Sequence, residues 1–109
     1  MADRAVIESV QRYLKRLGDE GFATSFAVVF GSHARGDCHE WSDIDLLVVS
    51  TRFDGEIRRE DVSRLWRVAA RTDSGIEPIP CGERQWDEDA STSVIEIARR
   101  EGSRVTPAA

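Results

Sequence analysis

The sequence has no long hydrophobic run. It contains no stretch of about 18 consecutive apolar residues, which is roughly the minimum for a helix that crosses a bilayer. Its first residues, Met1 to Arg4, begin a polar amphipathic segment without the apolar core of a signal peptide. These absences argue against a membrane protein, and we expect a cytoplasmic one with no membrane partner.

Cysteine is scarce, and no Cys-x-x-Cys pair occurs. The chain has two cysteines, Cys38 and Cys81, which we expect to be reduced in a cytosolic protein. Together with the two histidines, His33 and His39, they match no standard spacing of zinc ligands. Neither a disulfide framework nor a zinc site is therefore expected.

Basic residues are outnumbered by acidic ones, and the net charge is −5. A surface that binds nucleic acid in general is basic, so we do not expect nucleic acid as a general partner. The net charge does not exclude a small anionic substrate, because a bound metal ion can outweigh it locally.

What is present is the composition of a globular domain. The chain has 109 residues, of which 40% are apolar and 32% are charged, values typical of one folded domain with a small core. We expect a single domain over residues 1–105, followed by a flexible tail over residues 106–109.

Hydrophobic periodicity predicts alternating helices and strands, which indicates an α/β or α+β fold. Pro78 and Pro80 suggest that the last strand lies at an edge of the sheet. The expected elements are a helix over 3–17 capped by Asp3 and stopped by Gly18, a strand over 26–30, a loop over 36–42, a strand over 43–50, a turn at Asp54-Gly55, a helix over 56–72, an extended segment over 76–80, a loop over 82–89 and a helix over 91–101 stopped by Gly102.

Two aspartates begin the second predicted strand. Residues two apart on a strand project from one face about 6.6 Å apart, so Asp43 and Asp45 should point the same way from an otherwise apolar strand. Neighbouring carboxylates repel each other, and Mg²⁺ relieves this because it binds one or two carboxylates together with substrate phosphates. A solvated strand end is the simpler alternative reading of the same pair.

A glycine and a serine follow the first predicted strand. Gly31 allows a sharp turn close to a ligand, and free backbone N–H groups after it can bind phosphate, with the hydroxyl of Ser32 as a further donor. A Gly-Ser turn by itself is usually only a turn. The ordered combination of this turn, a spacer and the aspartate pair is more specific than either part.

The combined motif resembles the minimal nucleotidyltransferases of the polymerase-beta-like superfamily. It reads Gly-Ser-x-Ala-Arg-Gly over residues 31–36, then Ser-Asp-Ile-Asp-Leu over residues 42–46. The resemblance implies that residues 1–105 form a nucleotidyltransferase domain, a small mixed β-sheet with packed helices. It also implies transfer of a nucleoside monophosphate, AMP being the first expectation, from ATP or another NTP to a hydroxyl. Mg²⁺ would be bound by Asp43 and Asp45, and Gly31 and Ser32 would hold the β and γ phosphates.

The family usually has a third carboxylate on a later strand. The matching residue is Glu77, as metal ligand or as base for the attacking hydroxyl; an exposed glutamate at a strand edge is the alternative. Arg35 is a candidate phosphate ligand, although it could equally tie the loop to Glu40 or Asp37.

Several other residues have a functional and a structural reading. His33 is either an exposed spacer or a catalytic residue, and Ser42 is either a loop brace or a nucleophile. The arginines Arg64, Arg67 and Arg71 form either a solvated helix face or a surface that binds a partner or RNA. The tryptophans Trp41, Trp66 and Trp86 are either packing anchors or residues that stack on a base.

The resemblance further implies a separate partner, because the chain has no room for an acceptor-binding domain. Minimal nucleotidyltransferases pair with a small helical (HEPN-like) protein in toxin–antitoxin pairs, as the antitoxin, and some modify that partner by AMPylation. A homo-oligomer is the other expected assembly. The competing hypothesis is a binding module that neutralises its partner by contact alone, without catalysis.

Overall fold

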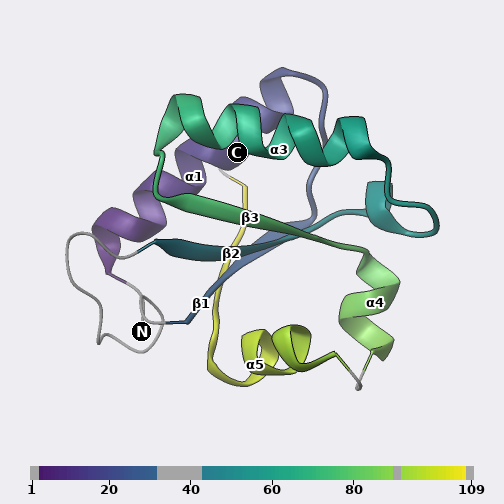
Figure 1. Ribbon diagram of the computed structural model, residues 1–109. Helices are drawn as coiled ribbons and strands as arrows, with labels where there is room; N and C mark the ends of the chain where they lie inside the picture. The colour runs from purple at the N-terminus through teal and green to yellow at the C-terminus, as the bar shows by residue number, and fades with distance from the viewer. Residues whose placement is uncertain (1–2, 32–42, 90–91, 108–109) are drawn as a thin grey trace.

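A computed structural model describes residues 3–31, 43–89 and 92–107. Within them the chain forms a mixed sheet in the order β3-β2-β1-β4 (Figure 1). β1 pairs antiparallel with β2 and with β4, whereas β2 and β3 run parallel. The strands are β1 (Phe26–Phe30), β2 (Ile44–Val49), β3 (Ile76–Cys81) and β4 (Ser103–Val105). The expected mixed sheet is confirmed, and β3 is at an edge as its prolines predicted.

Helices cover both faces of this sheet. In Figure 1, α1 and α3 lie on one side of it, and α4 and α5 lie on the other. A short 3-10 helix, η1, follows β2. The bounds are α1 (Arg4–Asp19), η1 (Thr51–Phe53), α3 (Arg59–Thr72), α4 (Glu83–Glu88) and α5 (Ser93–Glu101).

The two central strands are buried on both faces. On β2, Leu46 and Val48 belong to the core beneath α1 and α3, whereas Leu47 and Val49 belong to a second core beneath α5. Alternate side chains of a strand point to opposite faces, so two cores require apolar residues at every position. This explains why β1 and β2 read as continuous apolar runs in the sequence.

The first helix begins where it was expected and ends slightly later. The Asp3 carboxylate accepts a hydrogen bond from the Ala5 N–H at 3.4 Å and caps the helix. The predicted stop at Gly18 was early, since the helix runs to Asp19 and the positive φ of 83° occurs at Gly21. Inside, the Tyr13 hydroxyl donates to the Leu65 carbonyl at 3.0 Å and joins α1 to α3.

Other predicted boundaries need correction. The predicted helix over 56–72 begins only at Arg59, after a turn in which Gly55 has a φ of 88°. The predicted loop over 82–89 is wrong, because Glu83–Glu88 is a helix. Its six residues are too few to show a helical period, and its half-buried Trp86 packs against the second core. The sequence reading also missed β4, a strand of three residues.

The structural reading of Trp66 as a packing anchor is not supported on α3. Leu65, Val68 and Ala69 are buried, but Trp66 is 47% exposed and Ile57 is 42% exposed. None of the described helices is long and apolar enough to cross a membrane. The last described strand ends at Val105.

Candidate active site

The acidic residues Asp45 and Glu77 lie opposite each other on neighbouring strands. They are register partners in the parallel pairing of β2 and β3, and Asp43 immediately precedes β2. Residues two apart on a strand share a face, so Asp43 and Asp45 project on the same side as Glu77. The sequence had paired the two aspartates, and the strand register adds the glutamate.

The carboxylates lie beyond the part of the sheet that helices cover. Leu47 and Val49 continue the same face of β2 and are fully buried, whereas Asp45 is half-buried and Asp43 is exposed. Glu77 on β3 is also half-buried. The site is at the end of the sheet where β1 ends and β2 begins (Figure 1). An incoming ligand can therefore reach it from solvent.

The three acidic side chains interact electrostatically. Partial burial is the largest cause that raises the pKa of Glu77 above its ordinary value. The negative charge of Asp43, a hydrogen bond that protonated Glu77 donates to the Asp43 side chain, and the charge of Asp45 raise this pKa further. The protein thus holds like charges close together and favours a proton on one of them.

Gly31 is required by two independent features of the site. Its φ is 75°, a backbone conformation that residues with a side chain rarely adopt. A methyl group at this position would also overlap the Asp45 carboxylate. The turn that follows β1 therefore lies directly against the aspartate of β2, consistent with the register pairing of Phe30 and Asp45.

The donor set suits a hard divalent cation in part. Within the described ranges, no three side chains of the His, Cys, Asp and Glu types form a complete set of metal ligands. Mg²⁺ usually takes one or two carboxylates and completes its shell with water and substrate phosphates. Asp43 and Asp45 fit that pattern, because they are neighbouring carboxylates at least partly open to solvent.

The remaining motif residues are not part of the structural description. Ser32, Arg35, His33, Trp41 and Ser42 lie outside the described residues. The expected phosphate-binding roles of Ser32 and Arg35 thus remain predictions from the sequence.

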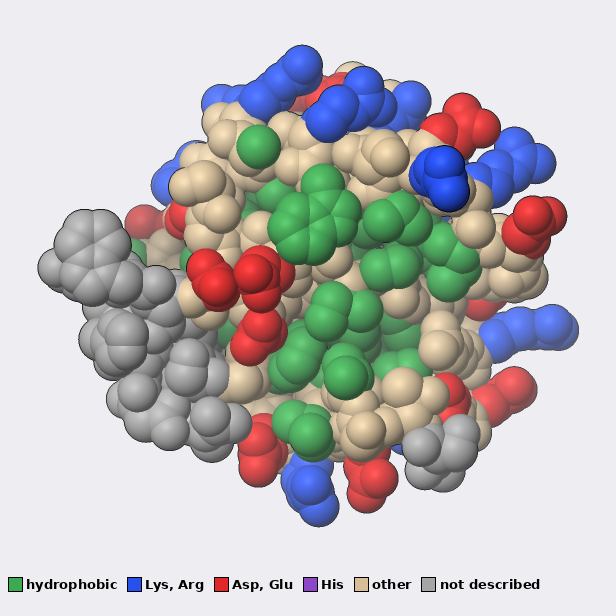
Figure 2. All heavy atoms as spheres, in the orientation of Figure 1, with side chains coloured by type: hydrophobic (Ala, Val, Ile, Leu, Met, Phe, Trp, Pro, Cys, Tyr) green, Lys and Arg blue, Asp and Glu red, His purple; other side chains and the backbone are tan. Residues whose placement is uncertain are grey.

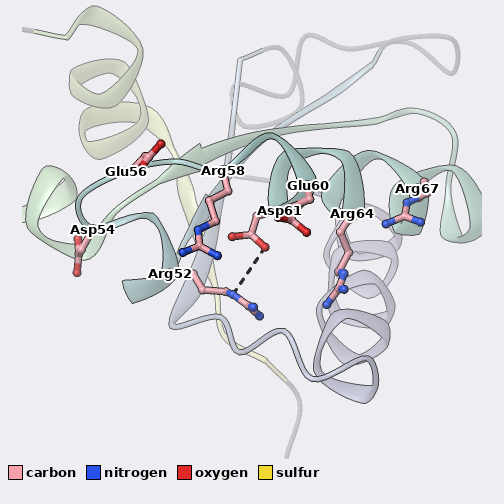
Figure 3. A pocket seen from close by; sticks show the side chains of 8 residues that line it. All are labelled: Arg52, Asp54, Glu56, Arg58, Glu60, Asp61, Arg64 and Arg67. Atoms are coloured by element: carbon pink, nitrogen blue, oxygen red, sulfur yellow. Dashed lines mark ion pairs between the residues drawn. The ribbon is translucent and has the colours of Figure 1, made fainter.

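Arg64 and Arg67 of α3 line a separate cleft of about 510 Å³ (Figure 3). It lies next to η1, which follows the far end of β2 from the carboxylates. Arg52 pairs with the nearly buried Asp61 at 3.8 Å and stacks over the Phe22 ring at 4.8 Å. Four basic and four acidic side chains line this cleft, so the predicted basic stripe lies beside acidic residues. The lining residues are Arg52, Asp54, Glu56, Arg58, Glu60, Asp61, Arg64 and Arg67.

A mixed sheet with carboxylates on adjacent strands and a glycine packed against one of them is suited to binding a metal ion together with phosphates. Residues 7–91 match the family described as "Nucleotidyltransferase domain". The chain belongs to this family and is a nucleotidyltransferase. No curated protein matches the chain significantly in sequence.

Solved structures share the fold. One is a candidate nucleotidyltransferase from Sulfolobus solfataricus, with 19% identity, a TM-score of 0.62, and coverage of 90% of this chain and 77% of the other. A toxin–antitoxin structure with AMP-PNP has 19% identity, a TM-score of 0.61, and coverage of 90% and 73%. A mutant form of the toxin–antitoxin pair MntA-HpeT has 20% identity, a TM-score of 0.59, and coverage of 89% and 71%.

Proposed function

We propose that this nucleotidyltransferase moves AMP from ATP to a hydroxyl group of a partner protein, with Mg²⁺ as its metal ion. The observation that carries the proposal is the interaction of Asp43, Asp45 and Glu77, which come from neighbouring strands and share one open face. Carboxylates held this close repel one another. A cation bound between them would neutralise this repulsion, so the site favours cation binding.

Each carboxylate has a proposed role. Asp43 and Asp45 would hold the metal ion, and Glu77 would act as a third ligand or accept the proton of the attacking hydroxyl. The position of Glu77 opposite Asp45 supports either role, because a carboxylate there lies beside the proposed metal ion. Bound Mg²⁺ would stabilise the negative charge that develops on the phosphate oxygens.

The proposed reaction is an in-line substitution at phosphorus. The acceptor oxygen forms a bond to the α-phosphorus of ATP, the bond from that phosphorus to the bridging oxygen breaks, and pyrophosphate leaves. The hydroxyl proton passes to Glu77 or to solvent. Gly31 and Ser32 would hold the β and γ phosphates, as the sequence motif predicts, and Arg35 is a further candidate phosphate ligand.

The nature of the nucleotide and of the acceptor is supported by the solved structures. One similar toxin–antitoxin structure contains AMP-PNP, an analogue of ATP, and another is the pair MntA-HpeT. We therefore infer that this chain is the cytoplasmic antitoxin of such a pair and that its acceptor lies on a helical, HEPN-like partner. Covalent modification of that partner would neutralise it.

The experiment is a mass measurement. The chain and the protein encoded beside it are purified, and the neighbour is incubated with ATP and Mg²⁺ in the presence of wild type or of Asp45→Asn. We expect the neighbour to gain the mass of one or more AMP groups with wild type only. Neutralisation without any gain in mass would instead establish the non-catalytic binding module.

A further inference from the structure

The free edge of β3 is closed to strand addition. The Ile44 N–H donates to the Gly75 carbonyl at 2.7 Å and the Ser50 N–H donates to the Cys81 carbonyl at 3.0 Å. The backbone N–H and C=O groups of successive residues in a strand point to opposite sides, so those of residues 77 and 79 also point toward β2. The backbone nitrogens of Pro78 and Pro80 therefore face away from β2. Proline has no N–H, and the edge thus lacks donors at both positions. A strand added here would find carbonyl acceptors but no N–H donors at these two positions, so a protein that binds this edge relies mainly on side chains.

An apolar surface lies along this edge, and we name it the β3 band. It consists of exposed Trp66 on α3 with half-buried Ile79 and Pro80 on β3. In α3, the flank with Arg64 lines the cleft beside η1. At 100° per residue, Trp66 lies on the opposite flank, which overhangs β3. Figure 2 shows hydrophobic side chains gathered over the β3 edge between α3 and the two C-terminal helices.

The β3 band continues into the carboxylate site. Ile79 follows Glu77 by two positions and shares its face of the sheet. In Figure 2, a cluster of acidic side chains borders the hydrophobic surface. Anything that covers the band therefore lies next to the carboxylates, within reach of a nucleotide bound there.

The residues around the β3 band indicate what kind of protein surface binds it. Arg59 lies two turns before Trp66 on the same flank of α3, where it is exposed and forms no ion pair within the described ranges. Small residues, Ser63 and Ala70, lie one turn before and after Trp66, so its ring stands clear of its neighbours on the helix.

We propose that the β3 band is the docking surface for the acceptor protein, whose contact face is an apolar helix flanked by acidic side chains. This inference rests on the proposed function, since it assumes that the acceptor hydroxyl belongs to a protein. Trp66 inserts into the apolar face, and Arg59 pairs with an acidic side chain beside it. The docked helix then presents a hydroxyl to Asp43, Asp45 and Glu77.

The test compares variants of exposed α3 residues. The protein encoded beside this chain is the probe, and its affinity is measured by calorimetry for wild type, Trp66→Ala, Arg59→Glu and the control Arg71→Ala. Trp66→Ala should weaken binding by about 30-fold or more, as loss of a buried aromatic anchor does. Arg59→Glu should weaken it at low salt, and Arg71→Ala should change it little. Circular dichroism confirms that each variant folds.

The other outcomes overturn the proposal. Equal binding by wild type and Trp66→Ala would show that the partner docks elsewhere on the chain. Absence of binding by wild type would show that the protein encoded beside this chain is not its partner. Light scattering that shows a wild-type dimer and a monomeric Trp66→Ala assigns the band to self-association. ATP binding by the isolated chain is measured in parallel. It tests the nucleotide site without the partner, so failure of docking is distinguished from failure of the proposed function.

Discussion

Asp45 and Glu77 face each other across the parallel pairing of β2 and β3, although 32 positions separate them in the chain. Besides partial burial, the negative charge of Asp43, which precedes β2, also raises the pKa of Glu77 and so couples this residue to the pair. The site is thus assembled from two strands and has the turn at Gly31 packed against one of its carboxylates. Each of these relationships has a measurable consequence.

Neutralising both aspartates should remove the part of nucleotide binding that depends on Mg²⁺. Asp43→Asn/Asp45→Asn keeps the size of the side chains but removes the charges that attract a hard cation. ATP titrated by calorimetry, with and without Mg²⁺, measures this. Asp19→Asn, a change at an exposed acid at the end of α1, is the control. Binding of Mg²⁺-ATP by the double mutant at wild-type affinity would exclude these residues as metal ligands.

Glu77→Gln should lower AMP transfer by about 10²-fold or more, the lower end for loss of a general base. Nucleotide binding should fall much less, because Asp43, Asp45 and the turn at Gly31 remain. A transfer assay with labelled ATP, run beside the binding titration, measures both quantities. Full transfer by Glu77→Gln together with none by Asp45→Asn would keep the enzyme but remove Glu77 from its mechanism.

Glu77→Gln should also raise the melting temperature at neutral pH in metal-free buffer. The folded state raises the pKa of Glu77, so it binds this proton more tightly than the unfolded chain does. The ionised carboxylate therefore lowers stability at pH values above the raised pKa and has no such effect well below the ordinary value of 4.5. Melting curves from about pH 4 to 8 should show a gain that disappears toward acid. A gain that is the same at every pH would point to packing instead.

Gly31→Ala should weaken nucleotide binding as well as destabilise the fold. The methyl group would combine an unfavourable φ of 75° with overlap of the Asp45 carboxylate. Gly55→Ala is a matched control, since Gly55 has a φ of 88° but no atom near the added methyl. We expect Gly55→Ala to cost about 1–2 kcal/mol from the backbone alone and Gly31→Ala to cost more. Denaturant unfolding and ATP titration measure these effects, and equal losses in both variants would contradict the contact with Asp45.

Much of the fold could be predicted because its signals are local. The apolar run of β1, the helical period of α1 and the cap at Asp3 each depend on residues close in sequence. The short helix α4 and the short strand β4 were missed, since neither has enough residues to show a period. Both form because they pack against or pair with β1 and its neighbours: the Phe26 ring meets Trp86 edge to face, and the Arg104 guanidinium lies 3.9 Å from the centre of the Phe26 ring.

For the site, the sequence by itself determined which residues close together in the chain are suited to bind a metal ion or a phosphate. Asp43 and Asp45 were paired by strand spacing, and Gly31 was identified by its position after an apolar run. Only the tertiary structure decided that Glu77 lies opposite Asp45, that Trp66 is exposed, and that the proline nitrogens of β3 face away from the sheet. The physical reason is that strand register and helix rotation depend on packing between distant segments. Spacing along one segment carries no information about that packing.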